Sequence, residues 1–116
     1  MTFARKTRFS RPVSQYQALM RSLARSLIIE ERISTTESKA KALRPFVERL
    51  VTYAKKNTLA SRRLAQARLH DPAAVKKLFG VIGPRYEKRA GGYTRVVKRT
   101  KRGANDARKL AYIAFV

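Results

Sequence analysis

The side chains best suited to chemistry in this sequence are cations, and a dense run of them spans residues 89–102. This stretch carries six basic residues and no acidic one, and a pair of glycines, Gly91-Gly92, lies near its start. Its β-branched residues favour a strand, in which successive side chains point to opposite faces. Tyr93, Arg95 and Arg99 would share one face, and Lys98 would lie on the other. Because neither face is free of charge, the pattern is not that of an ordinary half-buried strand, and a polyanion is the simplest partner.

The charge of the whole chain indicates the same class of partner. Twenty-eight Lys and Arg residues face seven Asp and Glu residues in 116, so the net charge is +21. Self-repulsion at this charge opposes a compact free state. Binding to nucleic acid would relieve the repulsion and release counterions from the phosphates. Hydrophobic residues make up 44% of the chain, an ordinary globular value, so we expect a folded domain that binds nucleic acid.

Catalytic and metal-binding chemistry finds little support in the sequence. Cysteine is absent, which excludes disulfides and thiolate zinc sites, and His70 is the only histidine. The acidic residues are scattered, so they form no acid–base pair, nucleophile triad or metal cluster at helical spacing. Gly91-Gly92 lacks the rest of a phosphate-binding P-loop. We therefore predict a protein that is not an enzyme, with no cofactor, no metal ion and no small-molecule substrate.

Residues 1–13 are interpreted as an extended basic arm, and residues 14–116 as a single domain. Pro12 opposes an earlier helix start. Two interpretations of the arm stay open, a frayed and solvated terminus or an arm that orders on RNA, and the global charge favours the second. The arm lacks the apolar middle of a secretory signal, whereas an organellar transit role stays open.

Apolar residues at helical spacing predict about four helices. The first runs from Ser14, where a weak capping box with Gln17 is expected, to about residue 29. The second runs over 37–56 and contains Pro45, which predicts a kink or two abutting helices. Four acidic residues fall between positions 30 and 48, so this edge is expected to face solvent or protein instead of RNA.

Asn57 and Thr58 can stop the second helix and cap the third. The third helix, over residues 59–69, should turn Leu64 inward together with Ala65 and Leu69. Asp71 and Pro72 form a strong helix start, which makes His70 a helix-end residue. The helix that follows is expected to end at the Gly83-Pro84 pair.

Three short segments favour strands. Residues 33–36 and 93–99 are rich in β-branched side chains, and residues 110–116 are almost wholly apolar, which is typical of a central strand. The last segment should pair antiparallel with 93–99 across a turn at 102–106. We predict a two-layer α/β (α+β) fold in which about four helices pack on a small three-stranded mixed sheet.

The candidate RNA-binding residues are spread over the arm, the first helix, a middle loop and the cationic strand, a distribution typical of a protein embedded among several RNA segments. Adjacent Arg62 and Arg63 diverge by about 100° on a helix, and solvated surface or RNA contact are equally supported for them. Tyr86 is expected in the core, whereas for Tyr93 the core and stacking on an RNA base are equally supported. The predicted set is Arg5, Lys6, Arg8, Arg11, Arg21, Arg25, Arg62, Arg63, Arg85, Lys88, Arg89, Tyr93, Arg95, Lys98, Arg99, Lys101 and Arg102.

Several linked motifs resemble those of one bacterial ribosomal protein family, the large-subunit family numbered seventeen. The similarity covers about residues 14–116, in order and without large gaps. The chain departs from the family at its start, Met1-Thr2-Phe3, and at Gln15-Tyr16-Gln17, where the family usually has Met-Arg-His and a His-Arg pair. The motifs that carry the resemblance are residues 33–41 (ISTTESKAK), 48–55 (ERLVTYAK), 61–64 (SRRL), 75–79 (VKKLF), 83–86 (GPRY) and 89–95 (RAGGYTR).

This resemblance implies a structural role in the large ribosomal subunit. The chain would bind and stabilise large-subunit ribosomal RNA near the exit of the nascent-chain tunnel, beside neighbouring ribosomal proteins. It would act in the cytoplasm, with an organellar ribosome as the alternative, and neither a membrane nor a second copy of the chain is an expected partner.

Two other classes of function compete with this interpretation. One is a small basic DNA-compacting protein or nucleic-acid chaperone. The other is a membrane-active basic helix at residues 14–29, which is less well supported because the basic charge continues into segments that are not helical.

Overall fold

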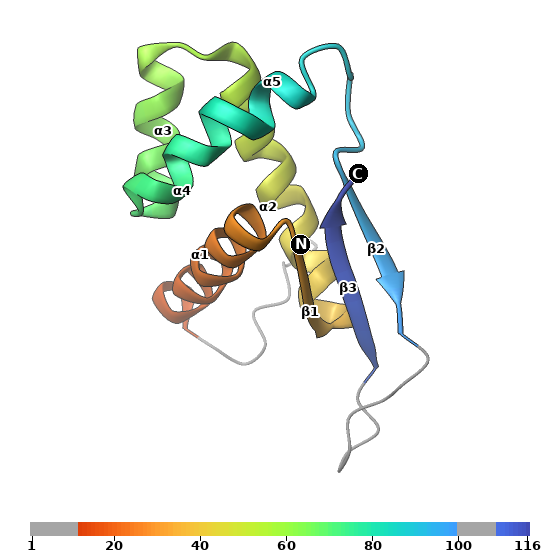
Figure 1. Cartoon of the computed structure of the whole chain (residues 1–116). Coiled ribbons are helices and arrows are strands. Elements are labelled where there is room, and N and C mark those ends of the chain that lie inside the picture. The colour runs from red at the N-terminus through yellow and green to blue at the C-terminus, as the bar shows by residue number, and fades with distance from the viewer. Residues whose placement is uncertain (1–11, 100–108) are drawn as a thin grey trace, which may run out of the picture.

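In the computed structural model, which describes residues 12–99 and 109–116, helices gather on one side of a small sheet (Figure 1). The chain begins with α1 (Val13–Glu30), β1 (Arg32–Thr36), α2 (Glu37–Lys56) and α3 (Leu59–Leu69). A helical stretch follows, made of α4 (Pro72–Lys77), the π-helical turn η1 (Leu78–Ile82) and α5 (Gly83–Arg85). Strands β2 (Thr94–Lys98) and β3 (Leu110–Phe115) complete the predicted α+β fold.

The sheet has the order β1-β3-β2, and both pairings are antiparallel. The prediction of a central C-terminal strand paired antiparallel with the cationic strand is therefore confirmed. The mixed sheet expected from the sequence is wrong in its strand directions, because β1 also runs antiparallel to β3. The turn predicted at 102–106 lies outside the described residues.

Helix α2 connects the two layers. It passes behind the sheet and continues into the helical layer, where α3 and α5 pack on it (Figure 1). Its buried stripe runs along the helix, and Phe46 beside it is only half-buried. The stripe consists of Ala40, Leu43, Val47, Leu50, Val51 and Ala54. The helix is continuous through Pro45, so of the two predicted alternatives the one with two abutting helices is wrong. Burial on both sides of Pro45 outweighs the cost of about 3 kcal/mol that a proline imposes on an isolated helix.

Local signals set most helix ends as expected. Asn57 ends α2 in a left-handed conformation, Thr58 caps α3 in a capping box with Ser61, and His70 ends α3 with φ 52°. Asp71 caps α4 by accepting a hydrogen bond from the Ala73 backbone N–H at 3.0 Å. These short-range contacts are readable from sequence because each involves residues within a few positions.

Three local expectations are wrong. Pro12 occupies the N-cap of α1 and no side chain caps this end, so Ser14 and Gln17 form no capping box. Leu64 is exposed, whereas Ser61 takes the inward position beside Ala65 and Leu69. The Gly83-Pro84 pair does not end the helical stretch either, since α5 continues to Arg85.

Gly83 is required by the close approach of α5 to α2. A Cβ at this position would lie 3.0 Å from both the Cβ and the carbonyl oxygen of Ala54. Packing, and not backbone conformation, is the reason for this glycine, because its φ of −55° suits any residue. Gly80, three residues earlier, has open space where its Cβ would be.

Glu31 joins the end of α1 to the helical stretch. Its carboxylate forms ion pairs with the Arg85 guanidinium and, at 3.2 Å, with the Lys77 ammonium. The hydrogen bond from Arg85, with a further one from Lys77, lowers the pKa of Glu31 from 4.5 to about 2 against the opposing effect of desolvation. The carboxyl group therefore binds fewer protons in the folded chain than in the unfolded one at acidic pH.

We predict that Gly83→Ala lowers the free energy of unfolding by roughly 1–3 kcal/mol, because the added methyl group overpacks the contact with Ala54. Urea denaturation measures the difference. Gly80→Ala is the matched control, and it should be neutral or stabilise by up to about 1 kcal/mol, since alanine is the better helix former. Equal effects of the two variants would show that α5 does not pack on α2 in this way.

We predict that the stabilising effect of Glu31, measured against Glu31→Gln, is lost as the pH falls from about 4.5 to 2. Its folded pKa is depressed, so its contribution is complete above the unfolded value and disappears as the pH falls through the folded one. The contribution should be about 1 kcal/mol, because solvent screens half-exposed ion pairs. Denaturation at several pH values measures it. Glu30→Gln, at a position with no ion pair in the described part of the chain, is the matched control for the loss of one carboxylate. Equal pH-dependent effects of the two variants would contradict a role for the ion pairs of Glu31.

Candidate nucleic-acid interface

The sheet has one covered and one open face. Side chains alternate along β3, so that Ala111 and Ile113 are buried against the helices while Tyr112 between them points to the open side. The strand register places Ser34 and Val97 on either side of Tyr112, and Val97 is 48% exposed. The open face is therefore made by the outward side chains of all three strands.

Two arginines contact Tyr112 on this open face. The Arg32 guanidinium carbon lies 3.9 Å from the centre of the Tyr112 ring, and that of Arg99 lies 5.0 Å from it. Arg99 also donates a hydrogen bond from Nη1 to Ser34 Oγ at 2.8 Å, and so it reaches across β3 to β1. Cation–π attraction and this hydrogen bond hold two flexible side chains over one ring. We call the residues Arg32, Arg95, Arg99 and Tyr112 the open-face cluster.

Arg95 adds a third cation one step along the sheet. The register pairs Ala114 of β3 with Arg32 on one side and with Arg95 on the other. Because neighbouring strands lie about 4.8 Å apart, the two arginine backbones are about 10 Å from each other, with only the alanine methyl group between them. Arg95 is exposed and has no hydrogen bond or ion pair in the described part of the chain.

Glu48 fixes the strand that carries Arg95. Its carboxylate accepts hydrogen bonds from the backbone N–H of Thr94 at 3.2 Å and from the Thr94 hydroxyl at 2.9 Å. Thr94 is buried, so this end of β2 is held against α2. At the other end, the Arg99 backbone N–H donates to Leu110 O, which extends the pairing with β3 by one residue. Both anchors constrain where the outward side chains stand.

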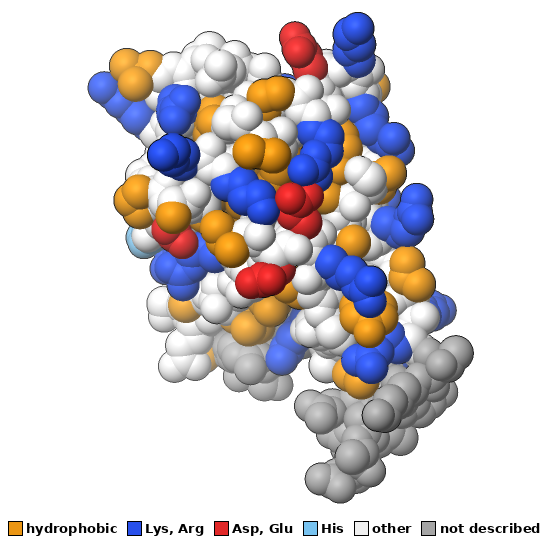
Figure 2. Space-filling model, in the orientation of Figure 1, with side chains coloured by type: hydrophobic (Ala, Val, Ile, Leu, Met, Phe, Trp, Pro, Cys, Tyr) orange, Lys and Arg blue, Asp and Glu red, His pale blue; other side chains and the backbone are white. Residues whose placement is uncertain are grey.

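No negative charge offsets these cations within the strands themselves. None of the three strands contains an acidic residue. Glu37, at the start of α2, pairs instead with Lys41 at 3.0 Å and with Lys98 at 3.5 Å, and Lys98 belongs to the covered side of β2. Figure 2 shows Lys and Arg side chains over much of the visible surface, with few acidic side chains among them. The open face can therefore bind anions, with arginine supplying bidentate contacts to phosphate.

Tyr93 is not available to stack on an external base, which corrects one of the two interpretations that the sequence left open. It is only 3% exposed, and its ring centre lies 5.4 Å from that of Tyr86, a core residue as predicted. Its hydroxyl accepts a hydrogen bond from Lys55 Nζ at 2.8 Å and donates one to Arg89 O. Tyr112, in contrast, faces the open side of the sheet, with Arg32 and Arg99 over its ring.

The other predicted residues are scattered, and some are engaged within the chain. Arg21 donates to Arg68 O, Arg62 lies over the Phe79 ring and Arg89 donates to Gly91 O. Arg85 and Lys98 form ion pairs with Glu31 and Glu37, so the chain itself partly neutralises their charge. Arg25, Arg63 and Lys88 have no such contact in the described part of the chain. Outside it lie Arg5, Lys6, Arg8, Arg11, Lys101 and Arg102.

Sequence reasoning missed Arg32 and Tyr112. A usable signal was present in each case, because Tyr112 alternates with Ala111 and Ile113, and Arg32 alternates with Ile33 at the start of β1. What the pattern does not give is the pairing of β1 with β3. That pairing alone brings Arg32 to the ring.

Residues 12–99 and 109–116 contain neither a metal-binding cluster nor a membrane-spanning helix. No group of three or more His, Cys, Asp or Glu side chains there could hold a metal ion. No helix in these ranges has the length and apolar character needed to cross a membrane.

Comparison with known proteins identifies the family. Residues 19–116 match the model of a family described as "Ribosomal protein L17". Three similar proteins carry the name "Large ribosomal subunit protein bL17". The one from Hydrogenobaculum sp. (strain Y04AAS1) is 57% identical over 97% of this chain and 95% of its own length. Those from Persephonella marina and Acholeplasma laidlawii are 52% and 47% identical, over 93% and 95% of this chain and 88% and 97% of their own lengths. The chain therefore belongs to the ribosomal protein L17 family.

Proposed function

We propose that this chain is a structural protein of the large ribosomal subunit and that its open sheet face binds the RNA of that subunit. The observation that carries the RNA-binding part is the open-face cluster, in which two arginines stack on Tyr112 and a third stands nearby without a carboxylate. The names of the similar proteins support the assignment to the large subunit.

The chemistry of the cluster suits RNA backbone better than a single small anion. Arg32 lies on one outer strand, and Arg95 and Arg99 lie on or directly after the other, so they present a row of cations across the sheet and not a closed pocket. Phosphates repeat along an RNA strand and can meet such a row, while the half-buried Tyr112 side chain offers a surface for a ribose or a base. Bound RNA would also relieve the self-repulsion of a chain with a net charge of +21.

Other RNA contacts belong to the same proposal. The scattered cations on α1, α3 and the loop before β2 would meet further RNA segments, and the basic arm would order on RNA. The position near the tunnel exit, beside other ribosomal proteins, is supported by the family resemblance alone.

We predict that replacing Arg32, Arg95 and Arg99 with Ala weakens RNA binding and flattens its salt dependence. Each lost phosphate contact should reduce the slope of log K against log salt by about 0.7 to 0.9, because fewer counterions are released. Titration of large-subunit RNA at several salt concentrations measures the slope. Thermal unfolding should change little, since the three side chains stand on the solvent side of the sheet.

The control is Lys76→Ala, which removes an exposed cation of α4 away from the sheet. It should leave the slope within error of that of the unchanged protein. If the triple variant also keeps the full slope, the open face does not contact phosphate.

We predict that the protein sediments with the large subunit when a lysate is fractionated at high magnesium concentration. The triple variant should be depleted from that fraction and recovered near the top of the gradient, because it has lost part of its contacts with the RNA. Sedimentation of the unchanged protein with DNA alone would support the DNA-compacting alternative and contradict a ribosomal role.

A further inference from the structure

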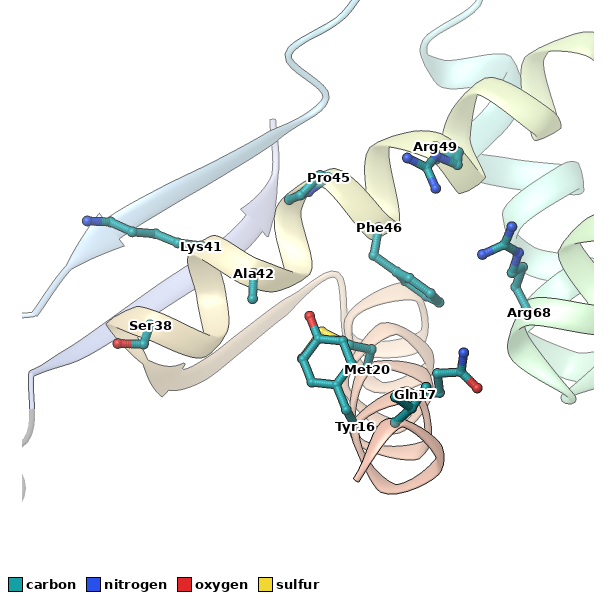
Figure 3. Close-up of a pocket in the computed structure, with 11 residues that line it drawn as sticks. Tyr16, Gln17, Met20, Ser38, Lys41, Ala42, Pro45, Phe46, Arg49 and Arg68 are labelled. Carbon is teal, nitrogen blue, oxygen red and sulfur yellow. The ribbon is translucent and has the colours of Figure 1, made fainter. Parts of the chain in front are cut away.

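A groove of about 650 Å³ lies between α1 and α2 (Figure 3). Its walls are largely apolar and include Tyr16 and Met20 from α1 and Phe46 from α2. Phe46 projects from α2 toward α1, and both aromatic residues are only half-buried, so the groove is accessible from outside. A smaller cavity lined by Phe46 and Tyr53 continues it toward α3.

The groove is separate from the open face of the sheet. The buried stripe of α2, which includes Ala40, Leu43 and Val47, packs on the covered side of the sheet. Residues of α2 that line the groove, such as Ala42 and Phe46, lie around the helix from this stripe. A ligand in the groove would therefore not be the one that contacts the open-face cluster.

One end of the groove carries a pair of cations. Arg49 of α2 and Arg68 of α3 stand there, on neighbouring helices (Figure 3). Neither guanidinium has an ion pair or hydrogen bond in the part of the chain that the structure describes. The backbone of Arg68 is joined to α1, because its carbonyl oxygen accepts a hydrogen bond from Arg21 Nε at 3.3 Å. Two guanidinium groups held on adjacent helices, with no carboxylate lining the groove, favour an anionic occupant.

The interior of the groove offers groups that match a nucleobase. The rings of Tyr16 and Phe46 provide aromatic surface for stacking. Gln17 adds a side-chain amide, which both donates and accepts hydrogen bonds as the edge of a base does, and Ser38 adds a hydroxyl. The groove thus combines aromatic surface, a few polar groups and a cationic end.

We propose that this groove binds one unpaired nucleotide of RNA, with its base against Tyr16 and Phe46 and its phosphate between Arg49 and Arg68. The inference rests on the proposed function, since it takes large-subunit RNA as the source of the nucleotide. An apolar protein segment fits the walls, but only an acidic one would satisfy the two arginines, whereas RNA carries an anion at every residue. The chain's own residues 1–11 carry four cations and no acid, so the arginines would repel them.

The test uses the full chain assembled into large subunits, with Phe46 replaced by p-benzoylphenylalanine and the crosslinked RNA position mapped by reverse transcription. The expected product is a crosslink to RNA at a single unpaired nucleotide. A crosslink from position 46 to another protein, or to the N-terminal residues of the same chain, would overturn the proposal.

The same photoreactive residue in place of Val97 distinguishes RNA binding by the open sheet face from nucleotide binding in the groove. Crosslinks to RNA from position 97 but to protein from position 46 would reject the groove and leave the proposed function intact. An absence of RNA crosslinks from both positions would reject both.

The second measurement is the salt dependence of binding by Arg49→Ala, Arg68→Ala and the double variant. If both arginines hold one phosphate, the double variant should lose about 0.7 from the salt slope, and each single variant should weaken binding nearly as much as the double. Lys76→Ala again serves as the control for loss of an exposed cation. Slopes that match this control in all three variants would contradict the phosphate site.

Discussion

With seven acidic residues in a chain of net charge +21, the place of each carboxylate decides how the surrounding surface is charged. Three glutamates, Glu31, Glu37 and Glu48, hold separate elements together. They join α1 to the helical stretch, and α2 to β2 at two points. Because these acids are used at internal boundaries, the outward side of the sheet keeps its arginines without compensation. The same few charges thus assemble the fold and leave one surface strongly cationic.

Helix α2 contributes to two separate surfaces of the molecule. Its buried stripe supports the sheet whose far side carries the open-face cluster, and another part of its circumference forms a wall of the groove with α1. Its continuity through Pro45 matters for both, since a break there would uncouple the half that supports the sheet from the half that packs on α3 and α5. A protein with cations on several sides can meet RNA segments that approach from different directions.

Two tyrosines, Tyr93 and Tyr112, show that burial and not residue type decides whether an aromatic side chain can contact a ligand. Tyr93 has cations as neighbours in the sequence, yet its ring is packed on Tyr86 and its hydroxyl is bound to Lys55. Tyr112 sits in an almost wholly apolar segment, yet it faces outward with two guanidinium groups over its ring. Sequence neighbours in a strand point to opposite sides of the sheet. The residues that a strand side chain contacts are therefore set by the adjacent strands.

Reading the sequence is enough to predict the helix and strand segments, the central position of the last strand, the caps at Thr58 and Asp71, the cationic character of the surface and, through its linked motifs, the family. These features depend on contacts between residues close in the chain, or on composition, and are therefore readable locally. Tertiary structure alone decided the antiparallel direction of β1, the persistence of α2 through Pro45, the burial of Tyr93 and the meeting of Arg32 with Tyr112. Each of these depends on residues far apart in the sequence, whose approach is fixed only when the core packs.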